Sequence, residues 1–329
     1  MTFRIAPPWW PVLAAASPVL APVLALRYRR HRRERDRVEQ TNRERIQLAR
    51  PLELPALERL ELTVLVEERC EPGFVGDAGV SYLLRSDRGS LLLDVGFGEE
   101  RPALTHNAAR LGLTLADADA LCISHLHLDH MGGMKAQRAR EVRLPDALGA
   151  PDGKPCFLPD RAEAPGFTAD LVTGPRMLGA GLATTGPLAR SLFVMGWTEE
   201  QALVANLEGK GLVVLTGCGH PTVELILDMV RHLSDLPLYA LIGGLHFPLT
   251  ASRGARAGIQ LQMVLGTGKP PWERLTEDDL NRAVVAIEAE KPERVLLSAH
   301  DSCDHALELL GNRLSARVEV LSAGATYQL

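Results

Sequence analysis

The sequence has few aromatic residues and no closely paired cysteines. Only 5% of its 329 residues are Phe, Trp or Tyr, so a hydrophobic core must be built mainly from Leu, Val, Ala and Ile. Its five cysteines are odd in number and none belongs to a C-x-x-C pair, which excludes a disulfide scaffold and a zinc knuckle and fits a reducing compartment. A hydrophobic fraction of 46% and a charged fraction of 23% are typical of a globular protein and exclude a mostly disordered chain.

Most of the chain also lacks an excess of basic residues. The net charge is −5, but residues 1–50 contain eleven arginines and only four acidic residues, so the remaining residues carry a net charge of −12. An acidic body gives no general electrostatic reason to bind nucleic acid, and we expect no nucleic-acid partner. The arginine-rich N-terminus needs a separate interpretation.

Residues 5–26 contain no charged side chain, and a cluster of arginines follows them from Arg27 onwards. About 20 apolar residues in a helix cross a bilayer core, and Trp and Tyr flank this run where amphipathic rings prefer the membrane interface. Because the arginines follow the run, the positive-inside bias predicts a single-pass membrane anchor with the large domain in the cytoplasm. The alternative is a proline-rich, poorly ordered tail on a cytoplasmic protein.

The remaining sequence has the alternating strand and helix patterns of an α/β protein. Pro51 and Pro55 favour a domain boundary, so we expect residues 1–50 to be a membrane anchor with a charged juxtamembrane helix, and residues 51–329 to be one folded domain. Apolar alternation and short apolar runs predict strands over residues 57–68, 79–86, 90–95, 118–123, 212–215, 238–242, 294–297 and 316–321. Helical patterns and capping signals predict helices over residues 100–112, 221–233 and 277–290.

Two stretches, residues 141–190 and 247–274, are rich in Gly and Pro and interrupt this rhythm. Loops of this length in a compact domain are usually functional lids or binding segments. We therefore expect both stretches to form the walls of a substrate pocket.

The segment from His125 to His130 places four potential metal ligands within six residues: His125, His127, Asp129 and His130. It follows an apolar strand and precedes a pair of glycines, where a tight turn can bring together side chains that a strand would send to opposite faces. Imidazole and carboxylate groups bind first-row divalent cations, and the two halves of the segment could hold two cations side by side. Ordinary surface histidines are the alternative, but this density of ligand types favours a metal site.

Three further histidines each follow an apolar strand and small residues: His220 after VVLTGCG, His246 after ALIGGL and His300 after RVLLSA. Loops at the carboxyl ends of strands gather into one site in α/β sheets, so we expect these histidines near the first cluster. Asp94, in LLLDVG, also ends an apolar strand. It is expected to orient a metal-bound histidine, with an ordinary turn residue as the alternative. The remaining histidines lack this setting and are expected on the surface or in helices: His31, His106, His232 and His305.

Taken in chain order, these features resemble the metallo-β-lactamase fold superfamily over about residues 57–329. The resemblance rests on Asp94, the HxHxDH signature at residues 125–130, His220 and His300. It implies an αββα sandwich, in which two packed β-sheets are flanked by helices. It also implies two metal ions, zinc most often, with iron and manganese as alternatives because histidine and aspartate bind all three. By resemblance, His125, His127 and His220 hold one metal, and the second is held by Asp129, His130 and His300.

The chain departs from the superfamily pattern at one position. Many hydrolases of the superfamily have an Asp that bridges both metals between the last two histidine motifs, whereas this chain has IGGLH at residues 242–246. TGCGH followed by GGLH resembles a branch of metal-dependent hydrolases related to 7,8-dihydropterin-6-yl-methyl-4-(β-D-ribofuranosyl)aminobenzene 5′-phosphate synthase. In that branch GGxH occurs at this place, which implies that His246 acts at the metal centre or on the substrate.

Together these features predict a metal-dependent hydrolase that uses metal-activated water on an ester, phosphoester or related bond of a small molecule. Asp129 is expected to accept a proton, and His246 to act as an acid or an oxyanion donor. Cys218 is expected to be a small packing residue rather than a nucleophile. The sequence does not indicate an oligomeric state.

Two other functions remain open at this level. One is a transferase of the synthase type, which would need a basic phosphate pocket. Basic residues in or beside the two Gly- and Pro-rich stretches could supply such a pocket or could be solvated loop charges: Arg140, Arg143, Lys154, Arg253, Arg256 and Lys269. The other is a non-catalytic, membrane-tethered metal-binding protein, which the complete HxHxDH signature argues against.

Overall fold

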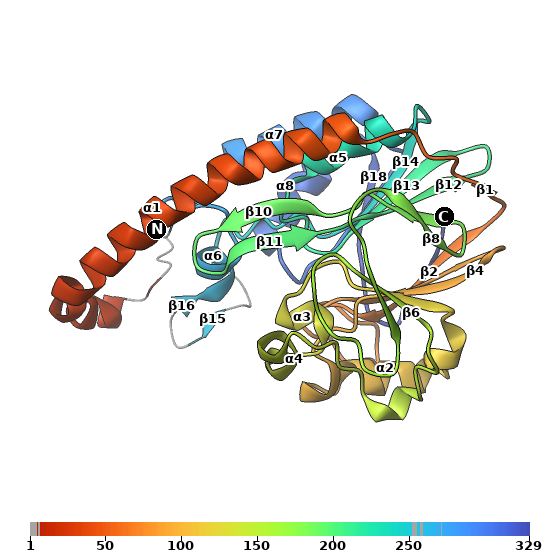
Figure 1. Ribbon diagram of the computed structural model, residues 1–329, viewed down its shortest axis with the longest axis horizontal. Helices are drawn as coiled ribbons and strands as arrows, with labels where there is room; N and C mark the ends of the chain where they lie inside the picture. The colour runs from red at the N-terminus through yellow and green to blue at the C-terminus, as the bar shows by residue number, and fades with distance from the viewer. Residues whose placement is uncertain (1–4, 6, 252–254, 257–258, 271) are drawn as a thin grey trace.

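The computed structural model describes residues 5, 7–251, 255–256, 259–270 and 272–329. Two β-sheets pack against each other, helices cover their outer faces, and a long N-terminal helix extends beyond the body (Figure 1). One apolar cluster fills the space between the sheets, and two others join each sheet to its helices. The predicted αββα sandwich is confirmed.

The first sheet has seven strands in the order β19-β2-β3-β4-β5-β6-β7. β4 to β7 are parallel neighbours, and the other pairs are antiparallel. The strands are β2 (Leu60–Val66), β3 (Ser81–Ser86), β4 (Gly89–Leu93), β5 (Ala120–Cys122), β6 (Pro155–Leu158), β7 (Thr168–Leu171) and β19 (Thr326–Gln328). Its outer face packs against α2 (Ala103–Leu111), α3 (Leu128–Met131) and α4 (Met134–Ala139). Single 3-10 turns complete this half: η2 (Gly98–Glu100), η3 (Leu115–Asp117) and η4 (Asp146–Leu148).

The second sheet has the order β18-β17-β14-β13-β12-β9-β8, with β1 paired to β12. Its strands are β1 (Ala56–Leu57), β8 (Arg176–Gly179), β9 (Leu182–Thr184), β12 (Leu203–Leu207), β13 (Gly211–Thr216), β14 (Leu238–Gly243), β17 (Arg294–Leu297) and β18 (Arg317–Val320). Its outer face is covered by α5 (Val223–Leu233), α7 (Glu277–Glu290) and α8 (Asp304–Arg313).

β13 shows why the central strands are continuous apolar runs. Successive side chains of a strand point to opposite faces. Leu212 and Val214 pack against the helices, whereas Val213 and Leu215 pack between the sheets. Because both faces of the strand are covered, no position in it favours a polar residue. The predicted helices are present as α2, α5 and α7, and a capping box of Thr276 and Asp279 opens α7 at the expected residue.

The N-terminal helix α1 (Trp10–Leu48) follows the turn η1 (Pro7–Trp9), and its C-terminal half docks on the hairpin of β10 (Leu188–Leu192) and β11 (Gly196–Glu200). Asn42 exchanges two hydrogen bonds of 2.8 Å with the backbone of Ala189, and Arg45 Nη1 lies 2.6 Å from a Glu199 carboxylate oxygen. His31 lies within α1, which agrees with the expected surface or helix position, but it is buried in this contact, 3.0 Å from Ser191 Oγ.

The N-terminal half of α1 contacts the body much less. Val19, Val23 and Leu26 are each more than half exposed, and by length and composition α1 is a candidate membrane span. In Figure 1 this half of the helix projects away from the two sheets, at the left of the view. The expected apolar helix is therefore present, and the charged residues that follow it belong to the part that docks on the body.

The expectation of an irregular stretch over residues 141–190 is wrong. It contains the short strands β6, β7, β8 and β9 and the start of β10, and its glycines occupy turns between them, as the positive φ of Gly166 and Gly181 shows. The second stretch, residues 247–274, contains in its described part only α6 (Leu261–Leu265) and the two-residue strands β15 (Ala255–Arg256) and β16 (Ile259–Gln260). Turn residues were visible in the sequence, but the short strands between them carry little periodicity.

Candidate metal centre

The loops that follow five strands meet at one edge of the sandwich. β4 leads to Asp94, β5 to the 125–130 segment, β13 to His220, β14 to His246 and β17 to His300. Because both sheets present strand ends here, residues from the two halves of the chain come together. The structure therefore brings all six expected metal ligands and His246 to one place.

The first group of possible ligands contains His125, His127 and His220, which are all buried. One ring nitrogen from each lies within 4.8 Å of the other two. His127 Nδ1 is 3.1 Å from His220 Nε2. His125 Nε2 and His220 Nδ1 have no hydrogen-bond partner among the described residues, which is unusual for buried polar atoms.

The second group contains Asp129, His130, Cys218 and His300, with ligand atoms within the same 4.8 Å limit. Cys218 Sγ lies between the two imidazoles, 3.2 Å from His130 Nε2 and 3.1 Å from His300 Nε2. Asp129 contributes a carboxylate oxygen 3.7 Å from His130 Nε2. Cys218 was expected to be a small packing residue, but its sulfur faces the same space as the other donors.

His246 stands beside both groups. Its ring centroid is 4.6 Å from that of His220, and neither of its ring nitrogens has a hydrogen-bond partner among the described residues. Its backbone has a φ of 57°, and its amide donates a 3.0 Å hydrogen bond to the Asp301 carboxylate. This left-handed conformation directs the imidazole into the site.

Asp94 occupies the position next to His130. Its Oδ2 lies 2.6 Å from His130 Nδ1, and both carboxylate oxygens accept hydrogen bonds from Ser124, one from the backbone amide at 2.7 Å and one from the hydroxyl at 2.6 Å. Burial raises the pKa of Asp94, and the two bonds from Ser124 oppose that rise. The carboxylate therefore holds the ring of His130 so that Nε2 faces the second group.

Besides Asp301, two further carboxylates at the site were not identified from the sequence. Glu67, at the end of β2, accepts a 2.9 Å hydrogen bond from the Tyr82 hydroxyl and lies 3.7 Å from His300 Nδ1. Glu200, at the end of β11, accepts the backbone amides of Gly219 and His220 at 2.7 and 2.8 Å. Glu67 follows the apolar strand TVLV in the same way that Asp94 follows LLL, and this signal could have found it. Nothing in the sequence around Glu200 distinguishes it.

Five of the six imidazoles of the site are held in their neutral form. Burial lowers the pKa of His127, His130 and His246 to about 3, and it lowers the pKa of His125 and His220 well below the usual value. Burial disfavours charge on His300 too, but the carboxylates of Asp301, Glu67 and Asp129 outweigh it and raise the pKa to about 9. Neutral imidazole is the form that binds metal ions, so five of the six rings are ready to act as ligands.

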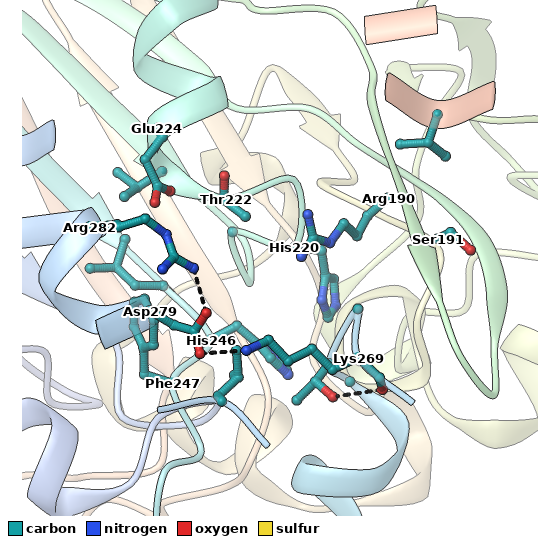
Figure 2. A pocket seen from close by; sticks show the side chains of 18 of the residues that line it. Arg190, Ser191, His220, Thr222, Glu224, His246, Phe247, Lys269, Asp279 and Arg282 are labelled. Atoms are coloured by element: carbon teal, nitrogen blue, oxygen red, sulfur yellow. Dashed lines mark hydrogen bonds and ion pairs between the residues drawn. The ribbon is translucent and has the colours of Figure 1, made fainter. Parts of the chain in front are cut away.

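Two cavities meet at His220 and His246. The first, of about 360 Å³, is lined by both ligand groups and by apolar side chains that include Phe97, Met195 and Leu265. The second, of about 300 Å³, lies between α1, β10, α5 and α7 and contains several charged side chains (Figure 2). Residues of the 247–274 stretch line both cavities, which agrees with the expected role of that stretch as a pocket wall.

Among the described residues, the basic side chains expected for a phosphate pocket do not come together to form one. Arg140 is bound to Asp160, Arg143 to Glu141 and Lys269 to Asp279, while Lys154 donates to two backbone carbonyls. Arg253 lies outside the described residues, and the side chain of Arg256 is not described. The basic residues in these stretches are therefore mostly used for local ion pairs.

Comparison with known proteins agrees with this architecture. The family model of the metallo-β-lactamase superfamily matches residues 75–140, which include the 125–130 segment. The crystal structure of Tm1679, a metal-dependent hydrolase of the β-lactamase superfamily, superposes with a TM-score of 0.58 at 19% identity over 82% of this chain and 99% of that chain. The chain has the metallo-β-lactamase fold.

Two other proteins resemble this metallo-β-lactamase-fold chain, one with a lower TM-score and one over a shorter stretch of sequence. The metallo-β-lactamase fold protein YhfI from Bacillus subtilis is 16% identical, with a TM-score of 0.48 over 83% of this chain and 100% of that chain. Beta-lactamase-like protein 2 homolog of Drosophila melanogaster is 26% identical over 157 residues, which is 47% of this chain and 53% of that protein. The chain thus matches about half the length of this curated relative. The relation to the synthase branch stays a prediction.

Proposed function

We propose that the protein is a metal-dependent hydrolase with two divalent cations, zinc being the first choice, acting on a small-molecule ester, phosphoester or related bond. The observation that carries the proposal is the pair of adjacent ligand groups, each confined within 4.8 Å. The similarity in fold to Tm1679, which is described as a metal-dependent hydrolase, supports it.

The donor set fits such cations. His125, His127 and His220 would hold one of them through neutral imidazoles, two of which have unpartnered ring nitrogens. The other would be held by Asp129, His130 and His300, with the sulfur of Cys218 as an added donor. Nitrogen, oxygen and sulfur ligands in this combination suit zinc, and the nitrogen and oxygen donors alone also suit iron and manganese.

The chemistry that divalent cations supply at such a site is Lewis-acid activation of water and of a carbonyl or phosphoryl group. Carboxylates of the chain would orient the histidine ligands for this chemistry. Asp94 orients His130, and Glu67 lies behind His300 in the same manner. Glu200 fixes the loop that carries His220 by accepting two of its amides.

Asp129 and His246 would act on the proton and the substrate. The Asp129 side chain is 25% exposed and lines the first cavity, so its carboxylate is accessible to a proton from an attacking water. His246 lines both cavities with two unpartnered ring nitrogens, so its neutral imidazole can donate a hydrogen bond to a developing oxyanion, whereas a pKa of about 3 argues against the expected role of an acid.

We also propose that residues 5–26 anchor the protein in a membrane, with residues 51–329 as the catalytic domain on the cytoplasmic side. The support is the exposed apolar surface of the first half of α1 and the arginines that follow it.

Fractionation of cells that express the full chain tests this membrane anchor. Val19→Asp combined with Val23→Asp should move the protein to the soluble fraction, and release of the unchanged protein by alkaline carbonate would contradict the anchor.

The hydrolase proposal is tested with the purified full chain in a neutral detergent. Elemental analysis should find two metal ions per chain, and a panel of esters, thioesters, lactones, phosphodiesters and pterin phosphates, assayed with Zn, Mn or Fe, should contain a hydrolysed substrate. Products of condensation rather than hydrolysis would favour the synthase-type transferase. Absence of turnover across the panel with both metals bound would favour the non-catalytic alternative.

His127→Ala should lose metal and hydrolysis while the protein stays folded. His232→Ala is the matched control, because His232 is exposed on α5 and, among the described residues, its ring pairs with the Asp228 carbonyl of its own helix. Full metal occupancy in His127→Ala would count against the ligand assignment.

A further inference from the structure

The second cavity contains an arginine, Arg190, that has no partner in the described part of the chain. Arg190 projects from β10 into this cavity, beside His220 and His246 (Figure 2). Its side chain is partly buried, yet no described side chain or carbonyl forms a hydrogen bond or an ion pair with its guanidinium. A guanidinium has five N–H donors in a fixed fork, and leaving them unused in a partly desolvated place is unfavourable.

The other charges of the cavity do not satisfy this arginine. Asp279 is already held by Lys269 at 2.6 Å and by Arg282 at 2.5 Å. Three further carboxylates line the cavity, those of Glu39, Glu224 and Glu273, and none approaches Arg190 within ion-pair distance in the described part of the chain. Arg35 lines the cavity on the side of α1, and like Arg190 it has no ion-pair partner among the described residues.

Two glycines bring the backbone against Arg190 and His246 in the same short segment. A Cβ at Gly266 would overlap the His246 ring, and a Cβ at Gly268 would overlap the Arg190 guanidinium. Any larger residue at either position would push one of these side chains away. The segment therefore holds the imidazole and the guanidinium on one wall, with the candidate metal centre behind His220 and His246.

We propose that Arg190 binds an anionic group of the substrate, a carboxylate or a phosphate, in the second cavity. The reacting bond of the same molecule would then lie in the first cavity, because the two cavities share His220, His246 and Gly266 in their walls. The fork of an arginine binds either oxyanion through two parallel hydrogen bonds, and Arg35 adds positive charge without competing for the same atoms. That the bound anion belongs to a substrate rests on the proposed hydrolase function, whereas anion binding by Arg190 does not.

Anion binding is measured first on the chelator-treated full chain in neutral detergent, so that oxyanions cannot bind a metal. Phenyl phosphate, phenylacetate and uncharged benzyl alcohol are titrated by calorimetry. We expect at least one of the two anions to bind and benzyl alcohol not to bind. Arg190→Gln should weaken that binding by about ten-fold or more, and Arg190→Lys by less, because lysine keeps the charge but not the fork.

Arg33→Gln is the matched control. It removes one positive charge from α1, but Arg33 is exposed and does not line the cavity, so anion affinity should stay unchanged. Thermal unfolding of each variant confirms that it is folded. If neither anion binds the unchanged protein, or if Arg190→Gln binds as well as Arg33→Gln, the proposal is overturned.

Turnover is measured second, on the metal-loaded protein, with 4-nitrophenyl butyrate and mono-4-nitrophenyl succinate as a neutral and an anionic ester. Arg190→Gln should raise KM for the succinate ester about ten-fold or more and leave KM for the butyrate ester unchanged. An equal change for both esters would contradict an anion subsite. If neither ester is hydrolysed while the chelated protein binds anions through Arg190, the hydrolase proposal fails on these esters and the anion site stands.

Discussion

Asp94 Oδ2 lies 2.6 Å from His130 Nδ1, in a place where both residues are completely buried. The contact fixes which nitrogen of His130 faces the second ligand group, and Ser124 holds the carboxylate from the other side. Orientation of a ligand in this way commonly changes metal affinity by about 10- to 100-fold.

Asp94→Asn should therefore lower the affinity for one of the two metal ions by about 10- to 100-fold and leave the other ion bound. The reason is that an amide cannot accept from both Ser124 and His130 in the same geometry. Metal content after dialysis against graded chelator measures the effect. Asp152→Asn is the control, because Asp152 is exposed and far in sequence from every ligand. Equal affinities in the two variants would contradict an orienting role for Asp94.

Cys218 should bind the second cation as a thiolate. Burial raises the pKa of its thiol, so the thiolate becomes stable only when a cation is bound next to it. The cobalt(II)-loaded protein should show the near-ultraviolet charge-transfer absorption of a thiolate–cobalt bond. Cys218→Ser should abolish the band, and Cys70→Ser, which changes an exposed cysteine, should keep it. An unchanged band in Cys218→Ser would exclude the sulfur as a ligand.

His246→Ala should retain both metals and lose about 100-fold in kcat. Its ring faces the junction of the cavities, and removal of one oxyanion donor has an effect of this order. Elemental analysis and steady-state kinetics are performed on the same preparation. Loss of a metal ion from His246→Ala would instead make His246 a ligand, as its proximity to Cys218 and His220 also allows.

The metal-free protein should lose stability as the pH falls from about 6.5 towards 3. His127, His130 and His246 have a pKa of about 3 in the folded chain, below the usual value of 6.5, so the unfolded chain binds more protons in this window. Each such histidine lowers the free energy of unfolding by about 1.4 kcal/mol for each pH unit that the pH falls within this window. His300, with a pKa of about 9, has the opposite sign and stabilises the fold below pH 6.5, an effect lost as the pH rises through 9.

Urea unfolding of the metal-free protein at a series of pH values measures this dependence. His127→Ala should reduce the slope between pH 3 and 6.5 by about 1.4 kcal/mol per pH unit, and His232→Ala should not. A slope that is the same in His127→Ala and the unchanged protein would show that His127 is not held neutral by burial.

Docking of α1 should contribute directly to the stability of the body. Asn42→Ala removes the buried side chain that hydrogen-bonds to both the N–H and the carbonyl of Ala189. An unsatisfied buried polar group lowers the stability of the fold by about 1–3 kcal/mol. Thermal unfolding in neutral detergent should show a lower Tm than for Arg43→Ala, which changes an exposed residue of the same helix. Equal Tm values would mean that the hairpin does not need α1.

The sequence alone was sufficient for features that depend on neighbours along the chain. The density of ligand types in residues 125–130 indicated a metal site, and the apolar runs and capping box indicated β13 and α7, because strands and helices repeat over a few residues. Histidines placed just after strands were predicted to meet, because the carboxyl ends of strands share an edge of the sheet.

Only the tertiary structure decided which lone residues join these features. Cys218, Glu200 and Arg190 carry no distinctive local pattern, and each gains its place from contacts with residues distant in the sequence. The same holds for the arginine-rich half of α1, which was expected as a charged juxtamembrane helix and docks on the β10–β11 hairpin. Charge and chemistry are properties of a residue, but burial and partners are properties of the packed chain, and these determine what a carboxylate, thiol or guanidinium can do.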